Sequence, residues 1–269
     1  MTLSGKIAIV TGSTSGIGAV TAEGLAEAGA RVVVTGRRAE RGEAVVARIQ
    51  GKGGEACFIA ADITREEEVA RLVGLTVERY GGLDIAFNNA GGGGGFGPLD
   101  QLDAETFAGV LAVNLTGTFF CLKHQIAAMR AAGGGGSIIN NASTAGVQGT
   151  ATGLSAYTAA KHGVVGLTRA AALEAGSAGI RVNALITGPV DTEEFRQRIS
   201  HQPGALESAG AHTALGRICG EAEVASAVTF LGGDDSAFIT GSLFELDGGM
   251  TAGVTRGDMQ RPGGRPGGN

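Results

Sequence analysis

Short apolar runs rich in β-branched residues alternate with longer amphipathic segments along nearly the whole chain, and this alternation restricts the possible folds most strongly. Seven runs are predicted to be strands: Ile7–Val10, Arg31–Thr35, Ala56–Ala60, Asp84–Asn88, Ser137–Asn140, Arg181–Ile186 and Ser242–Leu246. Period-two alternation is weak within them, as expected of strands buried on both faces. Apolar residues at i, i+3 and i+4 predict helices over Ile17–Gly29, Ala39–Gly51, Arg65–Tyr80, Ala104–Ala132 and Ser155–Gly179. Repeated strand–helix–strand units indicate an α/β fold with a doubly wound parallel sheet of about seven strands flanked by helices.

The chain is expected to form one domain. No linker or change of composition divides it before about residue 253, so residues 1–253 are assigned to that domain and residues 254–269, which lack an apolar pattern, to a disordered C-terminal tail. Glycine supplies 49 of the 269 residues, and four glycines follow helices where C-terminal caps belong: Gly29, Gly51, Gly81 and Gly133. Of two glycine runs, Gly91–Gly95 is expected on the ligand-binding side of the sheet, and Gly133–Gly136 is expected to be a flexible turn on the opposite side.

Composition argues against several classes of function. Charged residues make up only 17% of the chain, with a net charge of −5 and no basic stripe, so nucleic acid is not an expected partner. The three cysteines lie far apart without a C-x-x-C pair, which favours free thiols in a reducing compartment over a disulfide framework or a metal site. No signal peptide precedes the first strand, and no apolar stretch reaches the roughly 20 residues that span a bilayer. A soluble cytoplasmic protein without a membrane partner is therefore expected.

A glycine-rich turn joins the first strand to the first helix. Its spacing, Gly12, Gly16 and Gly18, is G-x-x-x-G-x-G rather than the usual G-x-G-x-x-G. Such a turn lets the backbone approach a pyrophosphate and directs helix N–H groups at it. A chance tight turn is the alternative in a chain so rich in glycine, but the position between strand and helix favours a Rossmann-type dinucleotide site.

The end of the second strand bears on the choice of cofactor. Gly36 stands where a carboxylate would bind a free ribose 2′-hydroxyl, and Arg37 and Arg38 follow it. Arginine accommodates a 2′-phosphate, so the sequence favours NADPH and leaves NADH possible. A solvated basic pair at a strand end is the alternative interpretation.

Three residues form a candidate catalytic group. Tyr157 and Lys161 are four residues apart in a predicted helix and therefore share a face. An ammonium beside a phenol favours the phenolate, so Tyr157 is expected to have a lowered pKa and to exchange protons near neutral pH. Ser143 follows a predicted strand at the ligand-binding edge, where a serine is also commonly a turn or capping residue.

These motifs together resemble those of the classical short-chain dehydrogenase/reductase family. Thr11–Gly18 matches T-G-x-x-x-G-x-G, Asn88–Gly91 matches N-N-A-G, and Ser143 precedes a Y-x-x-x-K motif at Tyr157 and Lys161. The resemblance covers roughly residues 4–250. It implies an NAD(P)-dependent oxidoreductase that transfers a hydride between nicotinamide and a carbonyl or alcohol. The Y-x-x-x-K spacing disfavours the enoyl reductases of similar fold.

The resemblance also implies roles for individual residues. Tyr157 would be the general acid or base, Lys161 would lower its pKa and hold the nicotinamide ribose, and Ser143 would polarise the substrate carbonyl. Asn114 would join a water chain to the lysine, although a polar residue that kinks a helix is its simpler role. Substrate binding is thus assigned to Ser143 and Tyr157. The remaining predicted cofactor contacts are Gly12, Ser13, Ser15, Gly16, Ile17, Gly18, Arg37, Arg38, Asp62, Ile63, Asn89, Ala90, Gly91, Gly188, Val190 and Thr192.

Two segments depart from the family pattern. Thr187 replaces the usual proline before Gly188, which leaves the path of the nicotinamide loop open. The interval from Ser143 to Tyr157 is about one residue longer than usual, so residues 150–153 could reshape the pocket. The variable lid is expected over Glu193–Leu215, where Phe195, His201 and His212 offer neither an aromatic cage nor a cationic cluster. Asn88 and Asn140 are expected to support the sheet.

Three functions remain open at this point. An NADPH-dependent ketone or aldehyde reductase is favoured over an NAD-dependent alcohol or sugar dehydrogenase, because Gly36 and Arg37 suit a 2′-phosphate. A catalytically silent nucleotide-binding regulator is disfavoured by the complete set Asn114, Ser143, Tyr157 and Lys161. The resemblance further implies a homotetramer in which the helices over 104–132 and 155–179 pair across one interface.

Overall fold

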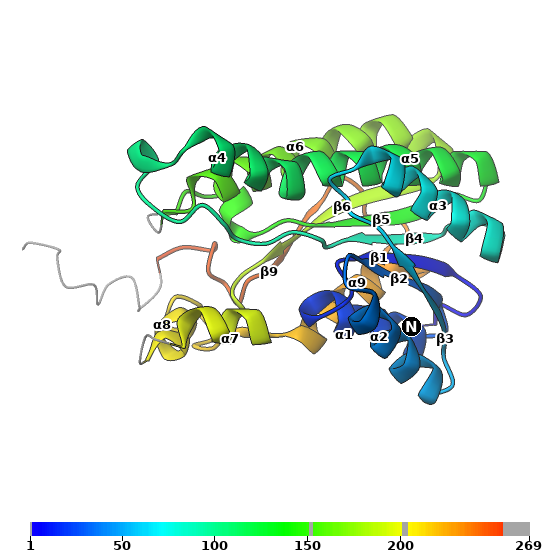
Figure 1. The fold of residues 1–269 in the computed structure, drawn as a ribbon, viewed down its shortest axis with the longest axis horizontal. Coiled ribbons are helices and arrows are strands. Elements are labelled where there is room, and N and C mark those ends of the chain that lie inside the picture. The colour runs from blue at the N-terminus through cyan, green and yellow to red at the C-terminus, as the bar shows by residue number, and fades with distance from the viewer. Residues whose placement is uncertain (1, 151–152, 201–203, 255–269) are drawn as a thin grey trace, which may run out of the picture.

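The fold is a seven-stranded parallel sheet between two layers of helices (Figure 1). A computed structural model describes residues 2–150, 153–200 and 204–254. The strand order is β3-β2-β1-β4-β5-β6-β9, with every neighbouring pair parallel. The order reverses direction between β1 and β4, so the connections leave these two strands toward opposite sides. The predicted fold class is confirmed.

The predicted strands are found within a residue or so of their expected ends. The observed strands of the sheet are β1 (Ile7–Thr11), β2 (Arg31–Gly36), β3 (Glu55–Ala60), β4 (Ile85–Asn88), β5 (Gly136–Asn141), β6 (Ile180–Thr187) and β9 (Leu243–Leu246). A separate pair, β7 (Val190–Asp191) and β8 (Cys219–Gly220), was not predicted. Two-residue strands carry too little pattern to be recognised from sequence.

Helices cover both faces of the sheet (Figure 1). One layer contains α1 (Gly16–Glu27), α2 (Ala39–Gly51) and α9 (Glu221–Gly232). The other contains α3 (Glu66–Tyr80), α4 (Ala104–Leu111), α5 (Gly117–Ala132) and α6 (Ser155–Ala175). Two short helices, α7 (Glu193–Ile199) and α8 (Ala205–Ala211), lie together beyond the end of the sheet. The sequence analysis missed α9, whose many alanines weaken its amphipathic pattern.

The helix predicted over 104–132 is continuous in direction but changes its hydrogen bonding. Residues Ala112–Thr116 form a π-helical turn between α4 and α5. This 29-residue stretch contains a segment of mean hydropathy 1.4, and by length and composition alone it is apolar enough to cross a membrane. By itself this is weak evidence for a membrane protein, because helices that pack on a sheet pass the same test. Only 28% of that segment is buried.

The core is divided by the sheet, and alternate strand residues face its two halves. Ala8, Val10, Val32 and Val34 pack toward α1, α2 and α9, whereas Ile7, Ile9 and Val33 pack toward α3, α5 and α6. Because both faces are covered, both sets of side chains are apolar, which explains the weak alternation in the sequence. Cys57 and Cys121 are buried free thiols, as predicted, and Cys219 is half-buried.

A buried polar network ties the helical layer to the centre of the sheet. The Asn88 amide donates to Gln125 Oε1 at 3.0 Å and to Asn140 Oδ1 at 2.9 Å, and Gln125 donates back to Asn88 Oδ1 at 2.8 Å. Asn140 in turn donates to Thr168 Oγ1 at 2.9 Å. Since unpaired buried amides are costly, these matched pairs fix β4 and β5 against α5 and α6. Asn88 and Asn140 thus support the sheet, as expected.

The predicted helix caps are found with one exception. Gly81 and Gly133 have positive φ angles of 89° and 70° at the ends of α3 and α5, and Gly29 has a φ of 98° just past α1. Gly51 instead remains helical as the last residue of α2, and the left-handed residue is Gly53, with a φ of 84°. The helix ends at Gly51, where the prediction also ended it, and the turn after it is closed by Gly53 rather than by Gly51.

The run Gly133–Gly136 is more constrained than the flexible turn that was predicted. Gly135 has a φ of +75°, and a Cβ there would lie 2.7 Å from the Gly179 carbonyl oxygen. A Cβ on Gly136 would overlap the Met129 sulfur. This turn therefore uses glycine so that the start of β5 can pass close to the start of β6.

Gly135→Ala is expected to destabilise the protein by about 1–3 kcal/mol, because it combines a left-handed backbone with a backbone clash. Gly134→Ala is the control, since a Cβ at Gly134 has no atom within 4 Å among the residues described. The free energy of unfolding by urea measures both. Equal stability of the two variants would show that the Gly135 contact does not restrain the turn.

Candidate active site

A cavity of about 1820 Å³ opens at the carboxyl ends of the central strands. It is lined by the turns after β1, β2, β4 and β5, by the start of α6 and by the α7–α8 segment. Ligands bind at this edge of open α/β sheets, at the point where the strand order reverses. Every predicted site residue lines the cavity except Ser13 and Gly18.

The turn between β1 and α1 has the backbone that the glycine spacing indicates. Gly12 and Gly16 have φ angles of +66° and +58°, a region that side chains other than glycine's rarely occupy. A Cβ on Gly12 would lie 2.8 Å from Ala90 Cα, so this turn touches the loop that follows β4. The first N–H groups of α1 therefore face the cavity at a site bare of side chains, which suits an anionic pyrophosphate.

Ser13 and Gly18 are near the turn but do not line it. Ser13 is fully buried, its hydroxyl donating to Val10 O at 2.6 Å and accepting from Thr35 N at 2.9 Å. Its own N–H donates to Thr35 O, so both its hydroxyl and its N–H are bonded within the protein. A Cβ on Gly18 would overlap the Gly12 carbonyl oxygen and lie 2.8 Å from Asn89 Nδ2. Both residues hold the turn in place rather than line the cavity. A match to the sequence motif cannot tell these two roles apart.

The arginines after β2 line the cavity beside the glycine turn. Arg38 donates to Thr14 Oγ1 at 2.9 Å and to Ser15 Oγ at 2.8 Å, which fixes it beside the glycine turn. Arg37 is largely exposed and lies 3.9 Å from Asp62. Asp62 accepts hydrogen bonds from the N–H and the hydroxyl of Thr64. Burial alone would raise the pKa of Asp62, but these bonds lower it, and the resulting pKa lies below the usual value for an aspartate. The positive charges of Arg37 and Arg38 therefore exceed the negative charge of Asp62 in this part of the cavity.

The loop after β4 is held from two sides. Thr11 Oγ1 accepts from the N–H groups of Asn89 and Ala90 at 2.9 and 3.0 Å. Asn114, buried in the π-helical turn, donates from Nδ2 to Gly92 O at 3.0 Å and accepts from Gly92 N at 3.1 Å. A Cβ on Gly91 would lie 2.6 Å from Asn114 Oδ1 and 3.7 Å from Lys161 Nζ. Asn114 thus anchors the glycine run and lies close to Lys161.

Ser143, Tyr157 and Lys161 come together at the inner end of the cavity. Lys161 is only 4% exposed, and its ammonium donates to the Asn141 carbonyl at 2.6 Å and lies 5.4 Å from the Tyr157 ring centroid. Burial lowers the pKa of Lys161 to about 8. Ser143 Oγ accepts from Ala145 N at 3.2 Å, and its hydroxyl donates to the phenol oxygen of Tyr157. Asn141 also donates to Asn89 Oδ1 at 3.0 Å, a role the sequence analysis missed.

The pKa of Tyr157 differs from the expectation. Burial raises it above the usual value for a phenol, whereas a hydrogen bond from Ser143 and the positive charge of Arg198 lower it in part. The predicted lowering by Lys161 is not found, because the ammonium lies over the ring and bonds Asn141 rather than the phenol oxygen. The phenol of Tyr157 is therefore protonated at neutral pH.

The nicotinamide loop follows a defined path despite Thr187. Thr187 remains in β6, where Gly188 N donates to Leu246 O at 3.1 Å. Val190 and Asp191 then pair with Cys219 and Gly220, and Thr192 caps α7 by accepting from Phe195 N at 3.0 Å. Gly188, Val190 and Thr192 consequently line the cavity.

The lid contains a cation that the sequence analysis overlooked. Arg198 lines the cavity, 5.8 Å from the Phe96 ring centroid and 5.2 Å from that of Phe195. Phe96 belongs to the glycine-rich loop, about 100 residues away in sequence, so no local pattern could pair them. His212 also lines the cavity, whereas His201 and residues 151–152 lie outside the described residues. The sequence analysis thus named no cation in the lid, whereas Arg198 is one that lies against a ring of the lid and a ring of the glycine-rich loop.

Comparison with known proteins decides the family. Residues 12–251 match a family model described as enoyl-(acyl carrier protein) reductase. A 2,5-dichloro-2,5-cyclohexadiene-1,4-diol dehydrogenase of Sphingobium indicum is 45% identical over 93% of this chain and 98% of its own. The chain belongs to the short-chain dehydrogenase/reductase family. The predicted family and the activity class, NAD(P)-dependent oxidoreduction between hydroxyl and carbonyl groups, are thereby confirmed.

Two further members of the short-chain dehydrogenase/reductase family are similar over nearly their whole length. A cis-4-hydroxycyclohexanecarboxylate dehydrogenase of Sinomonas cyclohexanicum is 39% identical, over 92% of this chain and 97% of its own. A crystal structure of a variant actinorhodin polyketide ketoreductase with NADPH has a TM-score of 0.86 and 36% identity, covering 91% of this chain and 97% of the other.

Gly18→Ala is expected to weaken binding of NADPH about 10-fold or more while the fold is retained, because the new Cβ would push the Gly12 carbonyl into the turn. Gly74→Ala in α3 is the control, since a Cβ there meets no described atom within 4 Å. Calorimetric titration gives the dissociation constants, and circular dichroism checks the fold. A folded Gly18→Ala protein with unchanged affinity would contradict the assignment of this turn.

Proposed function

We propose that this protein is an NADP(H)-dependent oxidoreductase that interconverts a cyclic ketone and its secondary alcohol, with Tyr157 as the acid that protonates the ketone oxygen. The observation that carries the proposal is the meeting of Ser143, Tyr157 and Lys161 in a cavity continuous with the glycine turn. A nucleotide site alone would fit a regulator. A buried ammonium beside a phenol that bonds a serine hydroxyl fits proton transfer.

The residues of the cavity suit a nicotinamide dinucleotide. The bare turn at Gly12 and Gly16 leaves room for a pyrophosphate, and Arg37 and Arg38 offer charge for a ribose 2′-phosphate. Asp62 and Ile63 lie where an adenine would, and Asn89, Ala90 and Gly91 border the middle of the cavity. Gly188, Val190 and Thr192 would hold the carboxamide end. When bound, the cofactor supplies or accepts the hydride.

The chain's own residues would handle the proton and the developing charge. A carbonyl oxygen between Ser143 and Tyr157 would accept hydrogen bonds from both hydroxyls, which stabilises negative charge on that oxygen. Because burial raises the pKa of Tyr157, its phenol holds a proton to donate at neutral pH. Lys161, with a pKa of about 8, can replace that proton, and Asn114 lies near enough to hold a water beside it. Alcohol oxidation reverses these steps.

The substrate class rests on the relatives. The Sphingobium and Sinomonas dehydrogenases are both named for substrates with a hydroxyl group on a six-membered ring. The wall of the cavity near Tyr157 includes Gly92–Gly95, Phe96 and Val110, which suits an apolar ring. We therefore place cyclohexanone-like ketones and the corresponding alcohols first among substrates. The cytoplasmic location and the homotetramer stay predictions.

Tyr157→Phe should lower kcat for reduction of 4-methylcyclohexanone by at least about 10³-fold, because it removes the proton donor and little else. Binding of NADPH should stay within about threefold of the wild type, a difference of roughly 0.7 kcal/mol. Tyr80→Phe makes the same change at the other tyrosine, which lies in α3 away from the cavity, and should leave kcat unchanged.

Steady-state rates of ketone reduction, measured with NADPH and with NADH, give kcat for the wild type and for both tyrosine variants. Retained turnover in Tyr157→Phe would overturn the role of the phenol. If the wild type instead reduced only an enoyl thioester, the carbonyl assignment would fail. Failure to consume either cofactor across ketones, aldehydes, sugars and alcohols would favour a nucleotide-binding regulator.

Arg38→Ala should raise the KM for NADPH about 10-fold or more and change the KM for NADH less than about threefold, because a charge-assisted hydrogen bond to phosphate is lost. Arg48→Ala is the control, since Arg48 bonds Glu23 on α1 and does not line the cavity. Equal effects on both cofactors would mean that Arg38 only supports the turn. A wild-type preference for NADH would favour the NAD-dependent dehydrogenase.

A further inference from the structure

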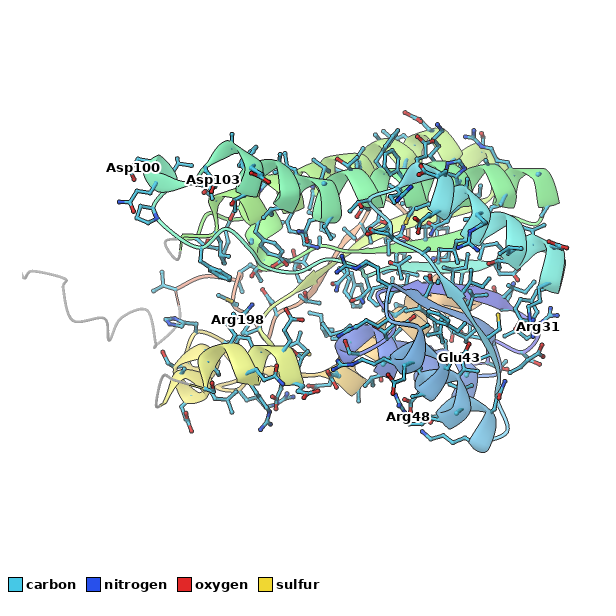
Figure 2. All side chains as sticks on the ribbon, viewed as in Figure 1. Arg31, Glu43, Arg48, Asp100, Asp103 and Arg198 are labelled. Atoms are coloured by element: carbon cyan, nitrogen blue, oxygen red, sulfur yellow. The ribbon has the colours of Figure 1, made fainter. Side chains whose placement is uncertain are left out.

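One charged side chain in the cavity has no place in the mechanism above. Arg198 extends from α7, on the side that faces the opposite helical layer (Figure 2). Its guanidinium lies within cation–π distance of two rings, 5.8 Å from the Phe96 centroid and 5.2 Å from the Phe195 centroid. A Cβ on Gly93 would lie 3.4 Å from Arg198 Nη1, so the cation also touches the glycine-rich wall.

Arg198 has no salt-bridge partner within 4 Å in the described part of the chain. Glu193 and Glu194 line the same cavity, yet neither makes an ion pair with Arg198 among the residues described. The other arginine of α7, Arg196, differs in this respect, because it forms a bidentate pair with Asp191 at 2.5 Å. Arg198 also donates no hydrogen bond to a protein acceptor in the described part of the chain. Its N–H groups are thus available to a ligand.

Arg198 and the catalytic phenol share one chamber. The positive charge of Arg198 is one of the influences that lower the pKa of Tyr157, which places the two groups within electrostatic reach. Both residues line the cavity, and the apolar wall of Phe96 and Val110 lies there as well. If a cyclic ligand places its carbonyl at Tyr157, its apolar ring would therefore lie against this wall. The opposite end of the ligand would then face the guanidinium of Arg198.

We propose that Arg198 binds a carboxylate on the substrate, so that the protein acts on cyclic keto acids and hydroxy acids in preference to neutral ring compounds. The proposal rests on the function proposed above and adds a substrate class to it. Guanidinium groups recognise carboxylates through paired N–H donors, and ring contacts at their faces leave those edges free. The similar Sinomonas enzyme is named for a hydroxycyclohexanecarboxylate, which agrees with this chemistry.

The test compares a charged and a neutral substrate of the same shape. For 4-oxocyclohexanecarboxylate, Arg198→Met should lower kcat/KM at least about 10-fold, whereas for 4-methylcyclohexanone it should change kcat/KM less than about threefold. Methionine keeps an unbranched apolar side chain that can pack against the rings, without the charge and the N–H donors. Arg196→Met is the matched control, because it removes an arginine of the same helix that already has a carboxylate partner. Arg198→Lys should recover part of the preference.

Binding without turnover separates this proposal from the function on which it rests. Calorimetry with cyclohexanecarboxylate in the presence of NADPH should give at least about 10-fold weaker binding to Arg198→Met than to the wild type. Equal losses for both ketones, unchanged kcat/KM for the carboxylate, or no binding of cyclohexanecarboxylate to the wild type would each overturn the role of Arg198. A wild type that reduces 4-methylcyclohexanone but not the keto acid would overturn this proposal alone. Carboxylate binding without turnover of any ketone would instead overturn the proposed function.

Discussion

The close contact between the ends of β1 and β4 determines the rest of the site. All seven strands run parallel, so their carboxyl ends lie at one edge, and the strand order reverses between these two strands. Gly12 has a left-handed backbone and no side chain, and a Cβ there would lie 2.8 Å from Ala90 Cα. Because the two loops touch, the helix N-terminus and the loop that carries Gly91 open on a single cavity. A side chain at Gly12 would meet the backbone of Ala90, so this contact requires glycine.

The protonation of Lys161 and Tyr157 depends on their burial. Enclosing Lys161 lowers the pKa of its ammonium to about 8, which by itself costs roughly 3 kcal/mol of stability at neutral pH. The sign follows from the direction of the shift: the unfolded chain holds this proton more tightly, so the cost diminishes as the pH rises from about 8 toward 10.5. The 2.6 Å bond to the Asn141 carbonyl offsets part of it. The same burial raises the pKa of Tyr157, so the phenol remains protonated where ketone reduction needs a donor.

Much of this architecture could be predicted from the sequence. The physical reasons for that success also explain which features could not be predicted. Buried parallel strands are continuous apolar runs, and glycines with positive φ are required by the backbone, so β1–β6 and the turn at Gly12 were found. Contacts between distant segments have no such pattern. Arg198 approaches Phe96 across the cavity, Asn114 bonds Gly92, and Ser13 turns inward; none of these follows from local spacing. The prediction of a lowered pKa for Tyr157 was wrong. The i, i+4 spacing places Tyr157 and Lys161 on one helix face, but it does not determine whether the ammonium contacts the phenol oxygen or the ring.

Transfer of deuterium from the cofactor to the product tests the central claim most directly. The purified protein would be incubated with a cyclic ketone and NADPH carrying deuterium at C4, in separate reactions for the two faces of the nicotinamide. Mass spectrometry of the alcohol should show one deuterium at the carbinol carbon from one of the two labelled cofactors and none from the other. Alcohol formed without deuterium from either cofactor would contradict direct hydride transfer in this cavity.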